Sequence, residues 1–288
     1  MELKHRHLGS VDTFLRPKIL AFRNRFVPWL PLITHLPQVG WWLSWNDYIG
    51  GRIYLSRGFE ESEQAFLLRF LQSGMIAFDI GAHHGVHTLL MSKRVGSQGL
   101  VIAFEPSPRE VHRLRWTLRV NRCSNVRVES YAMGSREGNE QLFVCMGRNS
   151  GCNSLRLPTI SEPFKTTKVP ITTLDNYLRE HEIHQVNLLK IDVEGAELEV
   201  LEGAMGLLSS GARPVIICEM ADVRTLPWGY PANKIYDLLQ SCKYLWFSAT
   251  PEGNLNPCPP KKDYRENLVA VPQEKLQGMK TMLAEGNN

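Results

Sequence analysis

Four apolar runs of this sequence each stop at an acidic residue. The four acids are Asp79, Glu105, Asp192 and Glu219. In an open parallel sheet, ligands bind in the crevice outside the carboxyl ends of the strands, because the connecting loops meet there. Scattered surface acids have no reason to fall at the same end of four strands. The pattern therefore predicts one ligand-binding crevice lined by carboxylates.

The turn after Asp79 has the residue types of a cofactor-binding loop. Gly81 and Gly85 follow Asp79, and a helical pattern begins after them. Glycine lets the chain turn sharply and approach a ligand closely, and the free N–H groups of the helix start point at that ligand. Glu105, at the tip of the next strand, lies where an acidic side chain accepts hydrogen bonds from both hydroxyls of a ribose. We therefore expect an adenosine-containing ligand.

The spacing of the turn favours one such ligand over another. A dinucleotide fingerprint has three glycines, G-x-G-x-x-G, so that a pyrophosphate can sit on the helix N-terminus. Here the pattern is Asp79-x-Gly81-x-x-x-Gly85, with an acid at the strand end and no third glycine. An acid repels a pyrophosphate and attracts an ammonium group. This favours S-adenosylmethionine, whose amino-acid end is zwitterionic, over NAD.

A repeated alternation of strands and helices positions these residues. The unit from Met75 to Glu105 is typical of a strand, a helix and a second strand, which imposes parallel strands with their loops on one edge. The sequence therefore predicts an α/β fold with a mostly parallel sheet. The expected strands are residues 75–78, 100–104, 126–130, 186–191, 214–218, 244–249 and 268–271, and the expected helices are residues 60–71, 109–121, 174–181, 194–208 and 234–241.

Several segments depart from this alternation. Residues 47–55 predict a short strand or hairpin. Residues 141–146 alternate like a half-buried strand, with which residues 168–171 can pair. The loop between them, residues 147–164, is long for a compact domain, and such loops are usually functional or floppy. Residues 221–232 follow Glu219 closely enough to cover a substrate.

The N-terminal segment predicts a basic amphipathic helix. Leu15, Ile19, Phe22 and Phe26 recur at helical spacing among Lys and Arg residues. The aromatic stretch that follows is broken by three prolines, which argues against a membrane-spanning helix. One interpretation is an arm that contacts a membrane surface or a partner. The other, which we favour, is a lid on the catalytic domain or a contact between subunits of a homo-oligomer.

Composition excludes several functional classes. A net charge of +4 over 288 residues, with dispersed charges, does not indicate a nucleic-acid partner. The six cysteines form no C-x-x-C pair, so neither a zinc site nor a disulfide framework is expected. The first residues are polar rather than the apolar core of a signal peptide, so a cytoplasmic location is the default expectation.

Four segments together resemble the FkbM family of S-adenosylmethionine-dependent methyltransferases. They are FDIGAHHGVHTL (78–89), FEPSP (104–108), TLDNYL (173–178) and LLKIDVEGAELEVLEGA (188–204). The resemblance extends from about Asp47 to Val271. It implies a Rossmann-like, seven-stranded, mostly parallel sheet with helices on both faces, the class I methyltransferase fold. We expect a helical extension over 1–46, this domain over 47–274 and a tail over 275–288.

The resemblance also assigns roles to residues of this chain. Asp79, Gly81 and Gly85 would shape the methionine pocket, and Glu105 would hold the ribose. Ser154, beside Asn153, matches a polar loop of the family. Asp192, Glu194 and Glu219 would face the acceptor. The complete set of expected cofactor-binding residues is Asp79, Gly81, Gly85, Thr88, Glu105, Pro106, Ala132 and Ser154.

The family usually methylates a hydroxyl of a sugar or natural product. Most of the catalysis can come from holding the acceptor oxygen in line with the methyl group, but a hydroxyl is a poor nucleophile at neutral pH, so a base or a metal helps. Asp192 and Glu219 should lie on neighbouring strands, close enough to share Mg²⁺ or two sugar hydroxyls. His83 is a candidate base. His84 and His87 are candidates too, although packing or surface roles explain them equally well.

Two other functions remain open. An NAD-dependent oxidoreductase or epimerase of nucleotide sugars is disfavoured by the missing third glycine. A non-catalytic scaffold that keeps the cofactor fold is disfavoured by the presence of all four carboxylates. The favoured function is methyl transfer to a small-molecule or glycan acceptor, with no nucleic acid as partner.

Overall fold

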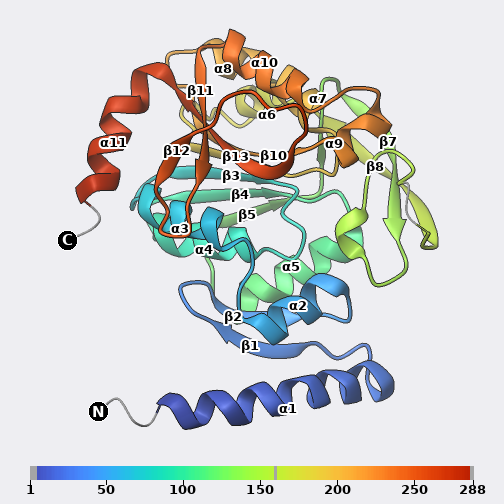
Figure 1. Ribbon diagram of the computed structural model, residues 1–288. Coiled ribbons are helices and arrows are strands. Elements are labelled where there is room, and N and C mark those ends of the chain that lie inside the picture. The colour runs from blue at the N-terminus through green and yellow to red at the C-terminus, as the bar shows by residue number, and fades with distance from the viewer. Residues whose placement is uncertain (1–4, 159–160, 286–288) are drawn as a thin grey trace.

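The computed structural model describes residues 5–158 and 161–285. Its centre is an eight-stranded sheet with the strand order β12-β11-β13-β10-β9-β3-β4-β5 (Figure 1). Neighbours among β3, β4, β5, β9 and β10 pair in parallel, and β13 runs antiparallel to both β10 and β11. The seven predicted strands are confirmed, with β12 as an added edge strand. The bounds are β3 (Ile76–Ile80), β4 (Leu100–Phe104), β5 (Val126–Glu129), β9 (Leu188–Ile191), β10 (Val215–Ala221), β11 (Tyr244–Ala249), β12 (Leu255–Pro257) and β13 (Arg265–Pro272).

Helices cover both faces of this sheet, because each strand presents alternate side chains to two apolar cores. Phe78 and Ile80 belong to one core, whereas Ala77 belongs to the other. The first core is closed by α6 (Leu174–Glu180), α7 (Glu197–Glu202), α8 (Met205–Ser209) and α10 (Asn233–Ser241). The second is closed by α3 (Glu61–Phe70), α4 (Val86–Val95), α5 (Pro108–Val120) and α11 (Leu276–Glu285). The expected Rossmann-like arrangement is confirmed.

The register brings the four strand-end acids to adjacent strands. Glu219 lies in β10, Asp192 directly follows β9, Asp79 lies in β3 and Glu105 directly follows β4. These four strands are consecutive in the sheet. In β9, Ile191 pairs with Cys218 of β10, and Lys190 pairs with Asp79 of β3. The predicted common edge therefore exists.

A second sheet lies beside this edge. It has three strands, β6 (Ala132–Met133), β8 (Phe164–Thr172) and β7 (Gly138–Cys145), in that order. Gln141 pairs with Lys168 in an antiparallel ladder, which confirms the predicted pairing. In the intervening loop, Ser154 bridges back to Phe143 of β7. That bridge holds the segment before 158 against the sheet, while residues 159–160 lie outside the described ranges.

The prediction of a strand or hairpin at residues 47–55 is wrong. These residues form helix α2 (Tyr48–Ser56), which starts because the Asp47 side chain accepts a hydrogen bond from the Gly50 N–H at 2.6 Å. An acidic N-cap satisfies one of the donors that the first helical turn leaves unpaired. The hairpin instead precedes the helix, as β1 (Leu32–Leu36) paired with β2 (Gly40–Ser44).

The single helix predicted over residues 194–208 is also wrong. The chain forms two short helices, α7 and α8, with Gly203 and Ala204 between them. A Cβ atom at Gly203 would lie 2.0 Å from the Gly134 carbonyl oxygen. The break therefore occurs where the backbone passes too close to its neighbour for any larger residue.

Both ends of the described chain pack on the domain. Helix α1 (His5–Phe26) lies along the outside of the molecule, beside the β1–β2 hairpin and in contact with α2 (Figure 1). Trp42 of β2 is buried in the second core, and so are Met279 and Leu283 of α11. The expected tail therefore contributes a core helix over its described part. Among the described helices, none combines the length and apolar composition needed to cross a bilayer.

Candidate functional site

A cavity opens at the carboxyl ends of β3, β4 and β9. It encloses about 990 Å³ of space that is free of atoms, including its open mouth, which suits a cofactor-sized ligand. Most of the predicted site residues line it: Asp79, Gly81, His83, Gly85, Glu105, Pro106, Ala132, Ser154, Asp192 and Glu194. Two predicted residues, Thr88 and Glu219, are not among its lining residues. The sequence therefore located the crevice but not each contact in it.

Asp79 provides a buried acceptor at one end of the cavity. Its Oδ2 accepts a hydrogen bond from the Thr88 hydroxyl at 2.5 Å, whereas its Oδ1 is buried and has no hydrogen-bond partner. Burial raises the pKa of the Asp79 carboxyl, against the opposing effect of the nearby Lys190 ammonium. A buried acceptor without a donor is costly unless a ligand supplies one. The Thr88 hydroxyl therefore holds the Asp79 side chain in position. The unpartnered Oδ1 can accept a hydrogen bond from an ammonium group.

The Gly81 turn passes directly against the neighbouring strand end. Gly81 has a φ of +88°, and a Cβ atom there would lie 1.8 Å from the Asp192 carbonyl oxygen. Its N–H and that of Ala82 both donate to the Phe104 carbonyl at 3.0 Å. Only glycine allows this approach without strain. The turn thereby joins the ends of three strands into one wall of the cavity.

Glu105 ties the same loop to the end of β4. Its two oxygens accept hydrogen bonds from the backbone N–H groups of His83, at 2.9 Å, and Ser107, at 2.8 Å. A carboxylate has about four acceptor positions, so two remain for a diol. Burial, followed by the nearby Glu110 carboxylate, raises the pKa of Glu105 to about 8. This geometry fits the two hydroxyls of a ribose.

The wall beyond Glu105 is largely apolar, with a polar loop facing it. Pro106, Tyr131, Ala132 and Met133 line the cavity there. From the loop, Ser154 donates a hydrogen bond to the Glu194 carbonyl at 3.3 Å. The Asn153 side chain accepts one from the Cys145 N–H, but its own buried amide nitrogen has no partner. An apolar slot with a few polar groups at its rim is what a flat heterocycle requires.

A buried cation, Lys190, organises the carboxylates at the strand ends. Its ammonium lies 2.9 Å from Asp192 Oδ2. Burial opposes the charged lysine, but Asp192, Glu60 and Asp79 together raise its pKa. The same ammonium, acting against burial, lowers the pKa of Asp192 below its usual range. Asp192 is therefore ionised at the cavity wall, and Lys190 is a site residue that the predicted set missed.

Glu60, at the start of α3, is a second residue outside the predicted set. Its Oε2 lies 3.3 Å from His87 Nε2. Burial raises the pKa of Glu60 to about 7, and burial lowers that of His87 well below its usual range. His87 thus packs as a neutral, buried imidazole. In the sequence, the one signal of the buried charges around Lys190 was this lysine itself, which interrupts the apolar strand LLKID.

Glu194 lies on the side of the cavity opposite Glu105 along the sheet edge. Its Oε2 lies 2.8 Å from Arg224 Nε, which comes from α9 (Asp222–Thr225) in the segment predicted to cover a substrate. Burial raises the pKa of Glu194 to about 8 in spite of this cation. A carboxyl that titrates near neutral pH can take up or release a proton during a reaction.

The structure gives no support to the predicted Mg²⁺ site at Asp192 and Glu219. Glu219 does not line the cavity, and one of its oxygens is buried without a partner. Burial, together with the carboxylates around it, raises the pKa of Glu219 well above its usual range. Lys190 already balances the charge of Asp192. The two carboxylates are therefore not presented together to the cavity as free ligands for a cation.

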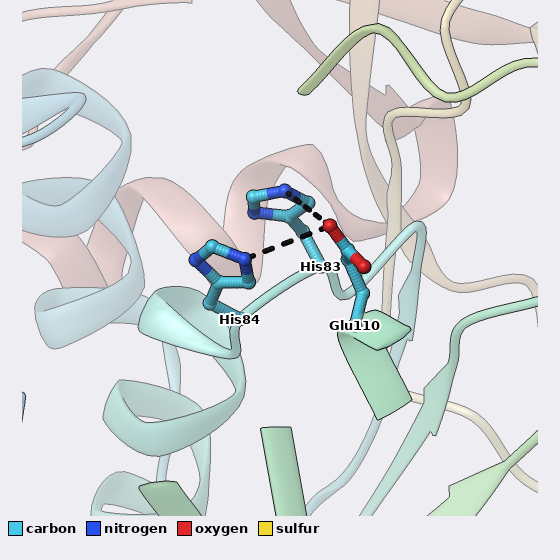
Figure 2. A group of neighbouring side chains, drawn as sticks. All are labelled: His83, His84 and Glu110. Atoms are coloured by element: carbon cyan, nitrogen blue, oxygen red, sulfur yellow. Dashed lines mark ion pairs between the residues drawn. The ribbon is translucent and has the colours of Figure 1, made fainter. Parts of the chain in front are cut away.

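His83 and His84 form a different cluster with Glu110 of α5, shown in Figure 2. The two imidazole rings stack with centroids 3.7 Å apart, and one nitrogen of each lies 3.8 Å from Glu110 Oε1. Their ligand atoms lie within 4.8 Å of one another, close enough for a metal. However, Arg109 donates to both Glu110 oxygens, and Arg113 lies 3.1 Å from His84 Nε2. The guanidinium groups of Arg109 and Arg113 therefore already supply the positive charge that a metal ion would bring to this cluster.

This cluster fixes the loop that carries several of the predicted cofactor-binding residues. Arg113 also reaches Asp47, the N-cap of α2, at 3.2 Å. His83 Nε2 lies 3.1 Å from the Ser150 hydroxyl. Burial, followed by His84, lowers the pKa of His83 to about 3. His83 is therefore a neutral imidazole that faces the cavity, and the network joins four segments that are distant in sequence.

The sequence model of the FkbM methyltransferase domain matches residues 79–246, which is more than half of the chain. The chain belongs to the FkbM methyltransferase family. The matched range begins at Asp79 and includes Glu105, Asp192, Glu194 and Arg224. Family membership separates the chain from the nucleotide-sugar oxidoreductases that the sequence left open.

Individual relatives of the family are distant. Over 141 residues the chain is 29% identical to Methyltransferase 1 of Beauveria bassiana, covering 43% of this chain and 56% of that protein. Over 152 residues it is 27% identical to the hexuronic acid methyltransferase AglP of Haloferax volcanii, covering 52% of this chain and 59% of that protein. The chain thus spans less than two thirds of the length of these relatives. A solved methyltransferase FkbM from Methylobacillus flagellatus KT aligns with a TM-score of 0.47 at 17% identity, covering 77% of this chain and 52% of that chain.

The expectation that the sequence lacks a Tyr-x-x-x-Lys pair, the catalytic arrangement of one oxidoreductase family, was wrong. Tyr230 and Lys234 stand in a Tyr-x-x-x-Lys arrangement. The Tyr230 hydroxyl donates to the Gly195 carbonyl at 2.5 Å and accepts from the Leu198 N–H at 3.2 Å. Both bonds hold the start of α7 in place. Tyr230 is therefore a structural residue of this FkbM domain.

Proposed function

We propose that this FkbM protein is an S-adenosylmethionine-dependent O-methyltransferase whose acceptor is a hydroxyl of a sugar, a glycan or a hydroxylated natural product. The observation that carries the proposal is the pairing of two acids at one cavity wall. Asp79 presents a buried, unpartnered oxygen, and Glu105 presents free acceptor positions on the adjacent strand. An ammonium group and a ribose diol complement these two acids, and S-adenosylmethionine contains both.

The residues present fit this cofactor. Asp79 would bind its ammonium group, Glu105 its ribose, and the wall of Pro106, Ala132 and Met133 its adenine. When bound, the cofactor supplies an electrophilic methyl group on a sulfonium. Thr88 holds Asp79 in place from outside the cavity lining, and Lys190, which itself lines the cavity, holds Asp192.

The acceptor side would be formed by Asp192 and Glu194. Asp192 is ionised and can accept a hydrogen bond from a hydroxyl, which orients the oxygen for attack. Glu194, with a pKa near 8, can accept the hydroxyl proton at mildly alkaline pH. Arg224, in ion-pair contact with Glu194, can also bind a carboxylate. His83 contributes a neutral nitrogen beside Ser150.

A hydroxyl-rich acceptor agrees with this chemistry. Charged and polar groups that converge on one wall bind polyols through paired hydrogen bonds, whereas an apolar acceptor would leave them unsatisfied. The relative from Haloferax volcanii is named for methylation of a hexuronic acid, which carries both hydroxyls and a carboxylate. A uronic acid would place its carboxylate near Arg224 and its hydroxyls near Asp192.

The test is transfer of a labelled methyl group from S-adenosylmethionine to a panel of acceptors. The panel contains hexuronic acids, neutral hexoses and simple phenols, each with and without a chelator. The proposal predicts labelled hexose or hexuronate ether products and loss of transfer in Asp192→Asn and Glu194→Gln. Labelling of phenols alone would exclude the sugar and glycan acceptors, and transfer to nitrogen or carbon acceptors would contradict the proposed O-methylation.

A further inference from the structure

Helix α1 presents its apolar stripe away from the protein. The outward side chains of its described part are Phe14, Leu15, Ile19, Phe22 and Phe26, which are between 43% and 64% exposed. The aromatic rings of Phe22 and Phe26 lie 4.9 Å apart, so they form a continuous patch. Directly after the helix, Trp29 and Leu30 are exposed as well. An amphipathic helix on a globular domain normally buries this stripe.

The opposite side of the helix is held by polar contacts. Arg23 is only 1% exposed and donates hydrogen bonds to the carbonyls of Leu30, Ser44 and Trp45. Arg16 donates to the Thr34 hydroxyl at 3.1 Å. These residues lie at helical spacing with buried Leu20. Because the inner side is fixed by Arg23, the apolar side must face outward.

Over the part of α1 whose side chains the structure describes, from Phe14 onward, the outward face is positively charged and carries no acid. Lys18 and Arg25 are exposed between the apolar residues and lie over the rings of Phe14 and Phe26. From Thr13 to Asn46 the sequence has four basic residues, no Asp and no Glu. Two copies of this face brought together would oppose like charges with no acid on it to pair them. An anionic surface, by contrast, matches both its charge and its apolar area.

We propose that α1 binds an anionic membrane surface in the plane of the bilayer interface. Phe, Leu and Ile side chains of the stripe would enter the boundary of headgroups and acyl chains, while Lys18 and Arg25 reach the phosphates. Trp29 suits the same depth, because its amphipathic ring favours the interface. The helix lies on the surface and does not cross the bilayer. This inference is independent of the reaction that the cavity performs.

The test is co-sedimentation of the full chain with vesicles of phosphatidylcholine alone or mixed with phosphatidylglycerol. We expect binding to the mixed vesicles that weakens as salt is added, and little binding to phosphatidylcholine alone. Lys18→Glu with Arg25→Glu, and separately Phe22→Ser with Phe26→Ser, should each lower the partition coefficient about tenfold or more. Matched controls on the far part of the molecule, Lys280→Glu and Leu245→Ser, should bind like the unchanged protein.

Two readouts keep the result interpretable. Thermal unfolding midpoints check that the substituted residues, which are exposed, leave the fold intact. Light scattering without vesicles measures self-association. The proposal is overturned if the mixed vesicles do not bind the protein, or if both α1 variants bind as well as the controls. It is equally overturned if the protein dimerises and the Phe22→Ser, Phe26→Ser variant alone makes it monomeric, because the patch is then a self-contact.

Discussion

The backbone N–H of His83 donates a hydrogen bond to Glu105 Oε2 at 2.9 Å, and this bond joins the loop after β3 to the end of β4. It ties Glu105, the proposed ligand for the ribose, to the loop that lines the proposed cofactor pocket. The carboxylate is the acceptor for two backbone donors at once, because Ser107 bonds its other oxygen. Substitution of Glu105 is therefore the strongest mutational test of the pocket.

Above pH 8, where the Glu105 carboxyl is ionised, Glu105→Gln should weaken binding of S-adenosylhomocysteine by about 10- to 100-fold, because charge-assisted hydrogen bonds are worth about 1.5–3 kcal/mol. Gln keeps the shape of the side chain but can accept at only one of its two end atoms. Calorimetric titration measures the change. The control is Glu137→Gln, an exposed glutamate that is not among the cavity-lining residues. Equal affinities of Glu105→Gln and the unchanged protein would rule out the ribose assignment.

Gly81→Ala should destabilise the fold and abolish cofactor binding, because its Cβ would lie 1.8 Å from the Asp192 carbonyl oxygen. Gly74 supplies a matched control. Its φ is +87°, almost the same as that of Gly81, but no atom lies within 4 Å of the added Cβ. Gly74→Ala should therefore lose only about 1 kcal/mol, the cost of the backbone conformation alone. Chemical denaturation compares the two, and equal losses would show that contact with Asp192 does not matter.

Lys190→Met should lower the free energy of unfolding by about 3 kcal/mol, because it leaves Asp192 and its neighbours without their buried cation. Adding Asp192→Asn in the same chain removes the uncompensated charge. The double variant should therefore regain much of the lost stability, and a double-mutant cycle measures the coupling. If the two losses simply add, the ion pair does not stabilise this edge of the sheet.

The free energy of unfolding should fall as the pH rises from about 6.5 to 8, by about 5 kcal/mol in total. Burial raises the pKa of several carboxyls in the folded protein from 4.5 to about 7 or 8, so the folded state holds protons that the unfolded state has released. The stabilising effect of these bound protons is complete below pH 4.5. It is lost as the pH rises through the pKa values of the folded protein. The residues are Glu60 and Glu197, near 7, and Glu105 and Glu194, near 8.

The two histidines with shifted pKa values do not obscure the change in stability between pH 6.5 and 8. The pKa values of His83 and His87 are lowered in the folded state, so their effect on stability lies mainly below pH 6.5. Urea denaturation at several pH values measures the slope. Glu194→Gln should flatten it, because the variant no longer titrates. A free energy that rises over this range would contradict the buried, protonated state of these carboxyls.

Much of the fold was predictable because its signals are local. The apolar runs, the spacing of Gly81 and Gly85, and the acids at the strand ends are each contained in a few consecutive residues. In a parallel sheet the carboxyl ends of the strands share one edge, so the sequence alone places Asp79, Glu105 and Asp192 there.

What could not be predicted depends on partners distant in sequence. The outward direction of the α1 stripe follows from Arg23 and its acceptors at Ser44 and Trp45, which no helical periodicity reveals. In the same way, Arg109 and Arg113 decide that His83, His84 and Glu110 form an ion-pair network. Glu219 was expected to face the acceptor, but it is not among the residues that line the cavity. It lies within β10, which continues to Ala221, rather than at the end of the strand.

The most direct test of the central claim is calorimetric titration of the purified chain with S-adenosylhomocysteine, with NAD as the competing ligand. We expect micromolar binding of S-adenosylhomocysteine, about −8 kcal/mol, and no measurable heat with NAD. Failure to bind S-adenosylhomocysteine, or tighter binding of NAD, would contradict the account of Asp79 and Glu105 as a cofactor pocket.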